Sequence, residues 1–493
     1  MKKIKKILIA NRGEIAVRII QAAKELRILT VCIYSKVDRL ALHVLRADEA
    51  FLIENNGIEP YLDVEQILKI SSIANVDAIH PGYGFLSENF KFAKRVVECG
   101  FLFIGPTHQA IEMMGDKLRA KDTAINANVP VIPGFEIKNG LDATEIKTAK
   151  KLGFPLLIKA RAGGGGKGMR IVHSEEELHQ QITLAVREAK EAFGNGAVFI
   201  EKFIIKPRHI EIQILADNYG NAVHLFEREC SIQRRHQKVI EEAPSAVLNA
   251  ELRKEMGNAA IRLVKAGHYS NAGTLEFVID KDKKFYFLEM NTRLQVEHPV
   301  TEFITGLDLV KQQIRIAEGE SLGLSQNDIK INGHAIELRV YAEDPKNSFL
   351  PDVGKLRDYS APKGIGVRVD DGYENDMEIP VEYDPLLAKL IVHGKTRHEA
   401  ISRMKRAISE YEIDGVKNTL EFGNWVMSDQ DFCSGNYNTG FISTKIDQFV
   451  NEESDKTYSM IAGIATYEFV EKFKAAKINN KPILQSKWRE RSK

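Results

Sequence analysis

The chain has 493 residues, of which 44% are hydrophobic and 28% charged, and its 69 basic and 68 acidic residues give a net charge of +1. This composition is typical of a globular protein of roughly three domains, and the charge balance excludes a general attraction to nucleic acid or to an anionic membrane. No apolar run reaches the roughly 20 residues that a membrane span needs. The four cysteines form no C-x-x-C pair, so we expect a cytoplasmic protein with free thiols.

Residues 1–116 alternate strand and helix patterns. A strand is predicted over Lys6–Ala10, a helix over Glu14–Glu25 and a second strand over Leu29–Tyr34. This β-α-β order predicts an α/β fold that begins with a Rossmann-like parallel sheet. The turn after the first strand carries one glycine, Gly13, and lacks the G-x-G-x-x-G fingerprint, so no NAD site is expected.

Two further blocks and a tail follow. Between residues 117 and 333 most predicted elements are strands of an antiparallel sheet, at Phe154–Ala160, Met169–Val172, Val198–Phe203, His209–Ala216, Asn221–Glu227, Thr274–Ile279 and Phe285–Asn291. Helices are predicted there over Glu175–Ala192 and 251–266. An α+β domain is predicted over residues 334–446, with strands at Ala335–Tyr341, Val367–Asp370 and Leu387–His393 and a helix over Arg397–Tyr411. Residues 447–493 form a polar, lysine-rich tail with one helical patch.

A glycine run, Gly163–Gly168, stands between two predicted strands and contains Lys167. Glycine lets the backbone come close to an anion, so the N–H groups of this run could cradle a phosphate. The run is not a Walker A loop, because that motif has Ser or Thr after the lysine and this chain has Gly168-Met169. A flexible surface hairpin is the alternative interpretation.

Two acidic residues are predicted to face each other across a hairpin. If the turn between the last two strands of the second block centres on Asp282 and Lys283, Glu276 lies opposite Glu289. Like charges in that position destabilise a sheet unless a cation lies between them. Asn291 shares their face and adds a third oxygen, and hard ligands of this kind suit Mg²⁺ or Mn²⁺ bound to phosphates. A solvated polar face is the alternative.

The chain after this hairpin carries a polar residue at every second position. If it stays extended, one face presents Glu289, Asn291, Arg293, Gln295 and Glu297. Such a face is costly to bury unless it serves a function. Arg293 could bind a planar anion through two hydrogen bonds, and Glu297 could act as a general base. An edge strand with a wet face is the alternative.

The segment Gln233–Lys238 concentrates positive charge. Near a triphosphate it would hold the phosphates, whereas in isolation such a run is usually a solvated surface. His209, which follows Pro207-Arg208, is expected close by.

Taken together, four segments resemble the biotin carboxylases of the ATP-grasp superfamily. They are Ile9–Ala16, His80–Asn89, Gln233–Lys238 and Glu289–Pro299. The resemblance covers residue 4 to about residue 446 and implies three domains. These are an N-terminal biotin carboxylase domain over 1–116, an ATP-grasp domain over 117–333 with a glycine-rich lid at about 131–203, and a C-terminal biotin carboxylase domain over 334–446.

The resemblance also implies an ATP-dependent ligase. ATP would phosphorylate bicarbonate to carboxyphosphate, and this intermediate would give carbon dioxide to N1 of biotin held on a carrier protein. The expected cofactors are ATP and a pair of Mg²⁺ or Mn²⁺ ions, with carrier-bound biotin as substrate. Phosphoryl transfer of this kind depends on positioning and on charge neutralisation by metal and cations.

Each matching residue then has an implied role. The nucleotide is expected to contact Lys117, Lys159, Gly163, Gly164, Gly165, Gly166, Lys167, Glu201, Lys202, Phe203, Ile204, His209, Gln233, His236, Glu276 and Glu289. The metal ions are expected on Glu276, Glu289 and Asn291, and bicarbonate on Lys238, Arg293, Gln295 and Val296. Catalysis is expected to rest on Lys238, Arg293, Glu297 and Arg339. Among these, Glu297 would remove the bicarbonate proton and Arg339 would stabilise the biotin enolate.

Two other classes of protein stay open. A different ATP-grasp ligase, such as a carbamoyl-phosphate or purine-synthesis enzyme, would share the glycine run and the paired carboxylates but would lack the pattern from Arg293 to Glu297. A nucleotide-binding scaffold without catalysis would lose Glu297 or Lys238, and both are present. Arg161, just before the glycine run, departs from the family, which usually has a small residue there.

The resemblance implies partners as well. No Ala-Met-Lys-Met biotinylation tetrapeptide occurs, so we expect the biotin carrier and the carboxyltransferase to be separate chains, and the enzyme to be a homodimer. The acceptor is expected to be acetyl-CoA or propionyl-CoA, in fatty acid biosynthesis or a related pathway, with pyruvate as the alternative. In the tail, helical spacing predicts an apolar stripe made of Tyr458, Ile461, Ala462, Ala465, Phe469 and Phe473. This stripe either packs on the body of the protein or docks another subunit.

Overall fold

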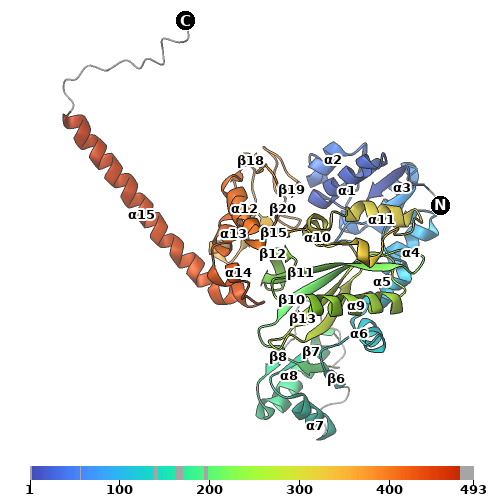
Figure 1. Cartoon of the computed structure of the whole chain (residues 1–493). Helices are drawn as coiled ribbons and strands as arrows, with labels where there is room; N and C mark the ends of the chain where they lie inside the picture. The colour runs from blue at the N-terminus through green and yellow to red at the C-terminus, as the bar shows by residue number, and fades with distance from the viewer. Residues whose placement is uncertain (1–2, 56, 138–142, 161–169, 194–197, 478–493) are drawn as a thin grey trace. The chain divides into compact units, whose positions relative to one another are not determined.

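A computed structural model describes residues 3–55, 57–137, 143–160, 170–193 and 198–477 (Figure 1). Its contacts divide the chain into two units, Met1–Phe441 and Ile442–Lys493. Among the described residues, no helix has the length and apolar character required to cross a membrane. The glycine run, with Arg161 and Lys167, lies outside the described residues.

The first unit begins with a five-stranded parallel sheet of order β3-β2-β1-β4-β5. Its strands are β1 Lys6–Ile9, β2 Leu29–Tyr34, β3 Glu49–Leu52, β4 Ala78–His80 and β5 Leu102–Phe103. Its helices are α1 Gly13–Glu25, α2 Leu42–Arg46, α3 Val64–Ile73, α4 Phe90–Glu98 and α5 His108–Gly115, with 3₁₀ turns η1 Lys36–Asp38 and η2 Pro60–Leu62. The strand order is that of a doubly wound fold, which confirms the predicted Rossmann-like sheet.

An eight-stranded antiparallel sheet forms the centre of the unit, in the order β14-β13-β10-β11-β12-β15-β20-β19. Its strands are β10 Arg208–Ala216, β11 Ala222–Arg234, β12 Gln237–Ala243, β13 Asn271–Ile279, β14 Phe285–Asn291, β15 His334–Tyr341, β19 Val367–Asp371 and β20 Leu386–Gly394. Because β12 pairs with β15, the sheet joins the second and third predicted blocks. Short two-stranded sheets of β16 Glu343–Asp344 with β17 Leu350–Pro351, and of β18 Asp358–Ser360 with β21 Glu412–Asp414, lie outside it.

Helices cover this sheet. They are α6 Lys117–Asn126, α9 Ala250–Ala266, α10 His298–Thr305, α11 Leu309–Ala317, α12 Arg397–Ser409, α13 Leu420–Val426 and α14 Gln430–Ser434, with 3₁₀ turns η3 Gln326–Asp328 and η4 Pro345–Asn347. Strand alternation decides which side chains they cover. Ile210, Ile212 and Ile214 of β10 share a core with Met256 and Leu263 of α9. The alternate residues of β10 therefore point to the other face, where the site forms.

A smaller antiparallel sheet, β6-β9-β7-β8, forms the predicted lid region. Its elements are β6 Gly134–Ile137, α7 Ala143–Leu152, β7 Leu156–Ala160, β8 Arg170–Val172, α8 Glu175–Phe193 and β9 Val198–Lys202. A separate core holds it together, with Ile158 and Ile200 of the sheet packed with Ile182 of α8. The glycine run falls between β7 and β8, which the sequence predicted as its flanking strands.

The hairpin of β13 and β14 places Glu276 opposite Glu289 as predicted, but by a different route. The turn is one residue longer than expected, since Asp280 donates its N–H to the carbonyl of Lys284. Leu288 is then left unpaired as a bulge on β14, which restores the predicted pairing. The prediction of the pairing is therefore confirmed, and that of the turn centre is wrong.

The predicted extension of the last strand beyond Asn291 is also wrong. β14 ends at that residue, and the chain then runs irregularly until α10 begins at His298. Pro299, in the first turn, suits a helix start because its missing N–H would have no partner there. Glu297 is consequently the residue that precedes the helix, and a loop brings the polar side chains together.

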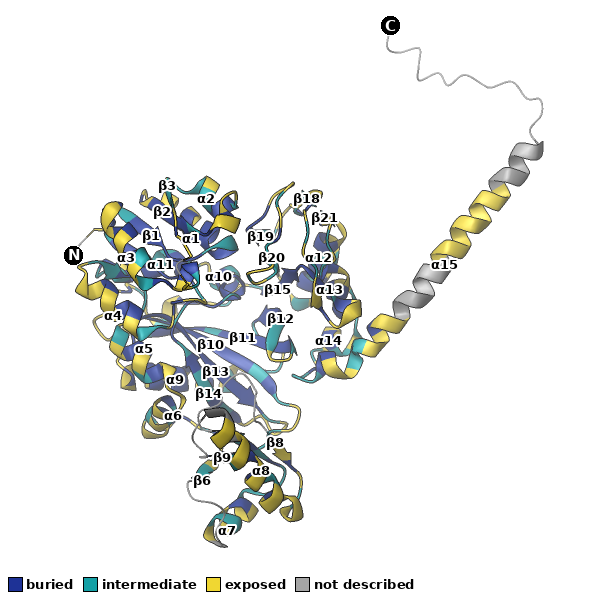
Figure 2. Cartoon of the chain, turned by 180° about the vertical axis from the view of Figure 1, so that it is seen from behind, coloured by how far each residue is buried: buried dark blue, intermediate teal, exposed yellow. Residues whose placement is uncertain are grey.

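The second unit contains most of α15, Phe441–Lys477. Residues 460–470 are all exposed (Figure 2). Large apolar side chains are among them: Met460, Ile461, Ile464, Tyr467, Phe469 and Val470.

Candidate active site

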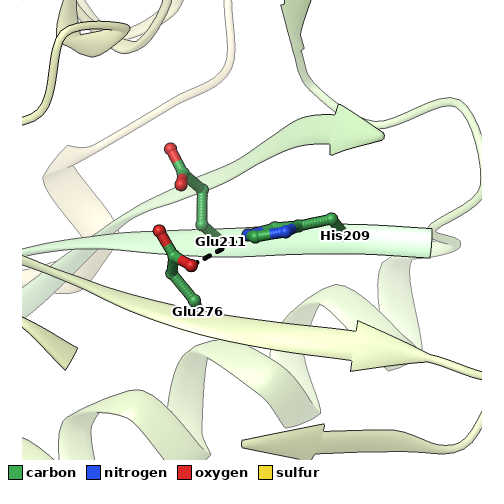
Figure 3. A group of neighbouring side chains, drawn as sticks. All are labelled: His209, Glu211 and Glu276. Atoms are coloured by element: carbon green, nitrogen blue, oxygen red, sulfur yellow. Dashed lines mark ion pairs between the residues drawn. The ribbon is translucent and has the colours of Figure 1, made fainter. Parts of the chain in front are cut away.

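Two neighbouring strands bring three ligating side chains together (Figure 3). His209 and Glu211 are two residues apart on β10, and Glu211 pairs directly with Glu276 of β13. The Nε2 atom of His209 lies 3.1 Å from a carboxylate oxygen of Glu276. Ligand atoms of all three residues lie within 4.8 Å of one another. The sequence predicted His209 and Glu276 but missed Glu211, although the polar residues at alternate positions of this strand were a usable signal.

Lys238 is the centre of the charged cluster. Its Nζ lies 2.5 Å from Glu211, 3.0 Å from Glu276 and 2.6 Å from Glu297. Its side chain is 11% exposed, so these carboxylates replace water around the ammonium group. Burial opposes the charged form of Lys238, but the three carboxylates outweigh it and raise its pKa well above the usual range.

Glu297 is fully buried between two cations. One oxygen accepts from Lys238, and the other lies 3.0 Å from the guanidinium NH2 of Arg339. Burial alone would raise the pKa of Glu297, but Lys238, Arg339 and Arg228 together hold it well below the usual range. The carboxylate is therefore ionised at neutral pH.

Arg339 and Arg228 fix the opposite walls of this cluster. Arg339 Nε donates to Glu241 of β12 at 2.7 Å. Arg228 is fully buried and donates to Glu211, to Gln213 at 2.7 Å and to Thr301 Oγ1 at 2.9 Å. Planar guanidinium groups with several buried acceptors leave the carboxylates little freedom to move.

The loop after β14 adds the remaining predicted groups. Arg293 donates to Gln295 Oε1 at 3.1 Å and reaches Asn291 Oδ1 at 3.4 Å. Asn291 Nδ2 in turn donates to Glu276 at 2.8 Å. Glu88, which the sequence analysis did not assign, accepts from Arg293 Nε at 2.8 Å. It belongs to the segment His80–Asn89, so this N-terminal segment helps to position Arg293.

The paired carboxylates are each neutralised by a different lysine. Glu276 is held by Lys238, whereas Glu289 lies 3.2 Å from Lys117 and is 39% exposed. Cross-strand repulsion between Glu276 and Glu289 is thereby relieved without direct contact between them. Asn291, hydrogen-bonded to Glu276, completes an oxygen-rich edge whose donors suit Mg²⁺ or Mn²⁺. The imidazole of His209 faces the same edge, where its Nε2 atom forms an ion pair with Glu276.

Other predicted nucleotide residues lie in and near the small sheet. Lys159 of β7 forms an ion pair with Glu201 of β9. Lys202 points elsewhere, since its Nζ donates to the carbonyls of Gly153 and Phe154 at 2.9 and 3.0 Å. The backbone of Phe203 donates to the Pro155 carbonyl at 3.1 Å, and Ile204 follows in the loop after β9. Gly163, Gly164, Gly165 and Gly166 lie outside the described residues.

The cationic segment divides into buried and exposed parts. Gln233 is buried and pairs with Lys238 across the β11–β12 hairpin. Arg235 and His236 form its exposed turn with φ values of 49° and 70°. A bulge at Val239 changes the phase of β12, so that Lys238 and Glu241 both reach the cluster. Lys238 lies in the charged cluster whereas Arg235 and His236 are exposed, so only part of the segment is a solvated surface. Its contact with a triphosphate stays a prediction.

Val296, which the sequence analysis expected to bind bicarbonate, is connected to a buried lysine through its backbone. Its carbonyl accepts from Lys389 Nζ of β20 at 3.0 Å. The same ammonium lies 3.1 Å from Glu14 in α1. Burial raises the pKa of Glu14 to about 7, although Lys389 opposes this shift. The sequence analysis missed Lys389, because one lysine in a predicted strand carries no local sign of its partners.

The arrangement combines a buried, ionised carboxylate, cations on both sides of it and an oxygen-rich edge next to a separate lid sheet. It can hold anions, accept a proton and bind a hard cation within a few ångströms. These properties suit a site for phosphoryl transfer.

Comparisons with known proteins place the chain more closely. Residues 3–111 match the biotin carboxylase N-terminal domain, 116–325 the ATP-binding domain of the carbamoyl-phosphate synthase L chain, and 337–444 the biotin carboxylase C-terminal domain. Biotin carboxylase 1 of Bacillus subtilis is 51% identical over 445 residues, which are 90% of this chain and 98% of that protein. The biotin carboxylase of a Nostoc species is 52% identical over 444 residues, 89% of this chain and 99% of that protein.

The solved structures agree. The biotin carboxylase domain dimer of Hydrogenobacter thermophilus 2-oxoglutarate carboxylase, in complex with MgADP, ADP and bicarbonate, is 48% identical, with a TM-score of 0.84 over 91% of this chain and 99% of that chain. This chain belongs to the biotin carboxylase family and is an ATP-dependent ligase. The alternatives of another kind of ATP-grasp enzyme and of an inactive scaffold are set aside.

Proposed function

We propose that this enzyme carboxylates the biotin of a separate carrier protein, using ATP and bicarbonate, as the first half-reaction of an acyl-CoA carboxylase. The observation that carries the proposal is Glu297, a buried ionised carboxylate held between Lys238 and Arg339. A base set between two cations suits a reaction that binds one anion, deprotonates it and then stabilises another.

Bicarbonate is assigned to the space bounded by Lys238, Arg293 and Gln295, together with the backbone at Val296. Arg293 is 19% exposed, so its guanidinium is accessible to a small anion. Glu297 then removes the bicarbonate proton. A bound anion would also interact with Lys238, so the electrostatic stabilisation of the Glu297 carboxylate by this lysine would become weaker. The pKa of Glu297 would then rise towards the value that a general base needs.

The nucleotide is assigned to the edge between the large and the small sheet. Lys117, Lys159, His209 and Gln233 line its approach among the described residues, and the glycine run with Lys167 is assigned to its phosphates. The hinge Glu201–Ile204 is assigned to adenine, and His236 to the exposed end of the site. Glu276, Glu289 and Asn291 would hold Mg²⁺ or Mn²⁺, which supplies charge neutralisation at the phosphates when bound.

Arg339 is assigned to the biotin enolate. Its Nε and one NH2 are held by Glu241 and Glu297, and its other terminal nitrogen lies 3.5 Å from the hydroxyl of Tyr341. The side chain of Arg339 is therefore held in position before any substrate enters. The protein then needs little rearrangement when the negative charge of the enolate develops.

The acceptor is proposed to be acetyl-CoA or propionyl-CoA, delivered through a carrier and a carboxyltransferase that are separate chains. Pyruvate is the competing acceptor, and a matching relative belongs to a 2-oxoglutarate carboxylase. A homodimer is proposed for the catalytic body, since that relative is described as a dimer.

The tail is proposed to dock these partner chains. The family matches end at residue 444, and relatives such as that of Bacillus subtilis are covered to 98% by 445 residues of this chain. The family match therefore includes only the first residues of α15, and the relatives have no counterpart of most of this helix. The exposed apolar side chains at 460–470 are then available to a partner, which would cover them on association.

The experiment is a reconstitution. The purified chain should convert free biotin to carboxybiotin only when ATP, Mg²⁺ and bicarbonate are all present, measured by fixation of labelled bicarbonate. Adding the carrier and carboxyltransferase chains with acetyl-CoA, propionyl-CoA or pyruvate in parallel then identifies the acceptor. ATP cleavage that ignores bicarbonate and biotin would contradict the proposal.

A further inference from the structure

The sheet beside Arg339 contains two buried acidic residues directly opposite each other. Glu241 of β12 and Glu337 of β15 are cross-strand partners, and both are 0% exposed. Cross-strand partners have Cβ atoms roughly 4.5–5.5 Å apart, so two ionised carboxylates here would repel each other strongly in a medium without water.

Nearby cations do not resolve this repulsion. Arg339 donates to Glu241 but makes no hydrogen bond to Glu337, and both carboxyl oxygens of Glu337 lack a hydrogen-bond partner among the described residues. Lys389, on the neighbouring strand β20, directs its ammonium to Val296, Glu14 and Asp370. An ammonium group has three donors, so little is left for Glu337.

We propose that Glu241 and Glu337 form a carboxyl dyad that holds one proton at neutral pH and sets the position of Arg339. Oε2 of Glu241 has no hydrogen-bond partner in the described part of the chain. A protonated Glu337 would supply the missing donor across the strand pair, and the same bond would satisfy one of its own two unpaired oxygens. The dyad then carries a single negative charge, which Arg339 neutralises.

The charges that face the dyad support this assignment. Glu297 is the other acidic group that acts on the dyad, and the basic groups are Arg339, Lys389 and Lys238. Burial and the neighbouring Glu241 raise the pKa of Glu337 well above its usual range. Burial likewise raises the pKa of Glu241 to about 7, against the charge of Arg339. Asp384 and Tyr341 face the other side of Arg339.

The consequence for the reaction rests on the proposed role of Arg339 towards biotin. With one proton on the dyad, Arg339 is shared evenly between Glu241 and Glu297. Loss of that proton would double the negative charge at β12 and β15 and draw the guanidinium away from Glu297 and from the enolate. Glu337 is thus a positioning residue that acts through Arg339, and its proton is expected to set the alkaline limb of biotin carboxylation.

The first test is spectroscopic and does not depend on activity. In infrared difference spectra of the whole protein, a protonated carboxyl group gives a carbonyl band that carboxylates lack. We expect such a band in the wild type at about pH 6.5, because burial and the neighbouring carboxyl group keep one of the pair protonated there, and we expect both Glu337→Gln and Glu241→Gln to remove it. Glu242→Gln is the control, because Glu242 is the next residue on β12 but is paired with His334 and Arg397.

The second test is the pH profile of kcat/KM for biotin. Glu337→Gln keeps a donor at the same place and cannot titrate, so turnover near neutral pH should stay within about twofold of the wild type. Its alkaline limb should move upward by about one pH unit or more. Glu242→Gln should leave the alkaline limb unchanged.

Three outcomes would overturn the dyad. One is a wild-type spectrum whose carboxyl bands are unchanged in both dyad variants. Another is an alkaline limb that stays in place in Glu337→Gln while the protein remains folded. A third is a tenfold loss of neutral turnover in Glu337→Gln, which would mean that Glu337 acts as a carboxylate. A failure of biotin carboxylation in the wild type would instead count against the proposed function, and the infrared result would still decide the dyad.

Discussion

The active site and α15 depart from the usual distribution of side chains in opposite ways. Lys238, Arg228 and Glu297 are charged and lie inside the protein, whereas Met460 and Ile464 are apolar and lie outside, 69% and 55% exposed. Charged groups are rarely buried without partners, and single exposed apolar groups are common whereas contiguous ones are not. In the site the partners are already present within the fold. In α15 the apolar side chains at 460–470 are exposed to solvent, which is why we propose that the tail docks another chain.

The largest effect is expected for the buried charged residues of the active site. Glu297→Gln removes the proton acceptor and leaves its shape, so carboxylation of biotin should fall by about 10²–10⁴. The dissociation constant for ATP should barely change, because the residues proposed to bind adenine, Glu201–Ile204, are not among the hydrogen-bond partners of Glu297. Fixation of labelled bicarbonate into biotin and a nucleotide titration measure the two quantities.

The matched control is Glu227→Gln, which removes another fully buried carboxylate of the same sheet, one that is paired with Arg253 outside the site. It should lower stability and leave the chemistry intact. Near-normal biotin-dependent turnover in Glu297→Gln would show that this carboxylate is structural.

A smaller effect is expected at the oxygen-rich edge. Glu276→Gln removes a proposed metal ligand and a partner of Lys238, so the Mg²⁺ concentration that gives half-maximal activity should rise by about tenfold or more. The measurement is activity against Mg²⁺ at saturating ATP. If Glu276 and Glu289 are only a polar sheet face, the variant will be neutral or more stable, with an unshifted curve.

Much of this interior was predictable because its signals are local. The register that pairs Glu276 with Glu289 follows from the hairpin, and two local deviations, the longer turn and the bulge at Leu288, cancel. Glu211 also has a local signal, since it lies two residues after His209 on the strand β10, where polar residues alternate with isoleucines. Glu337 and Lys389 could not be predicted in this way, because their partners are brought close only when β12, β15 and β20 pair. Those strands are far apart in the sequence.

The next prediction tests whether the exposed apolar side chains of α15 bind a partner chain. Truncation after residue 446 should leave carboxylation of free biotin unchanged and should abolish stable association with the carrier or carboxyltransferase chain, measured by gel filtration of the mixture. Ile464→Asp should weaken the same association about tenfold or more, since it places a charge in the apolar surface. Thr466→Asp, two residues away on the same exposed helix, is the control and should change it less. A truncated chain that unfolds would show that α15 belongs to the core of the catalytic body, and the docking proposal would fail.

The smallest expected effect concerns the pH dependence of stability. A buried carboxyl group with a raised pKa keeps a proton in the folded chain that the unfolded chain releases. Between the two pKa values the folded state binds more protons, so the free energy of unfolding contributed by this group is present at low pH and lost as pH rises. Glu337 and Glu241 both have raised pKa values, the latter about 7. The wild type should therefore lose stability between about pH 5 and about pH 8 at this site, and Glu337→Gln should lose less.

Glu242 provides the opposite case. Burial opposes its ionisation, but His334 and Arg397 hold its pKa at about 2. Its contribution to stability is thus present above the pKa of the unfolded chain and lost only as pH falls towards about 2. Glu242→Gln should lower the unfolding temperature by a similar amount across the range from about pH 5 to about pH 8 and leave the slope against pH unchanged. Thermal unfolding of the three proteins over that range separates the two behaviours. A slope in Glu337→Gln identical to that of the wild type would mean that the dyad is not the group that titrates, and the proton would have to be assigned to another buried acid such as Glu14.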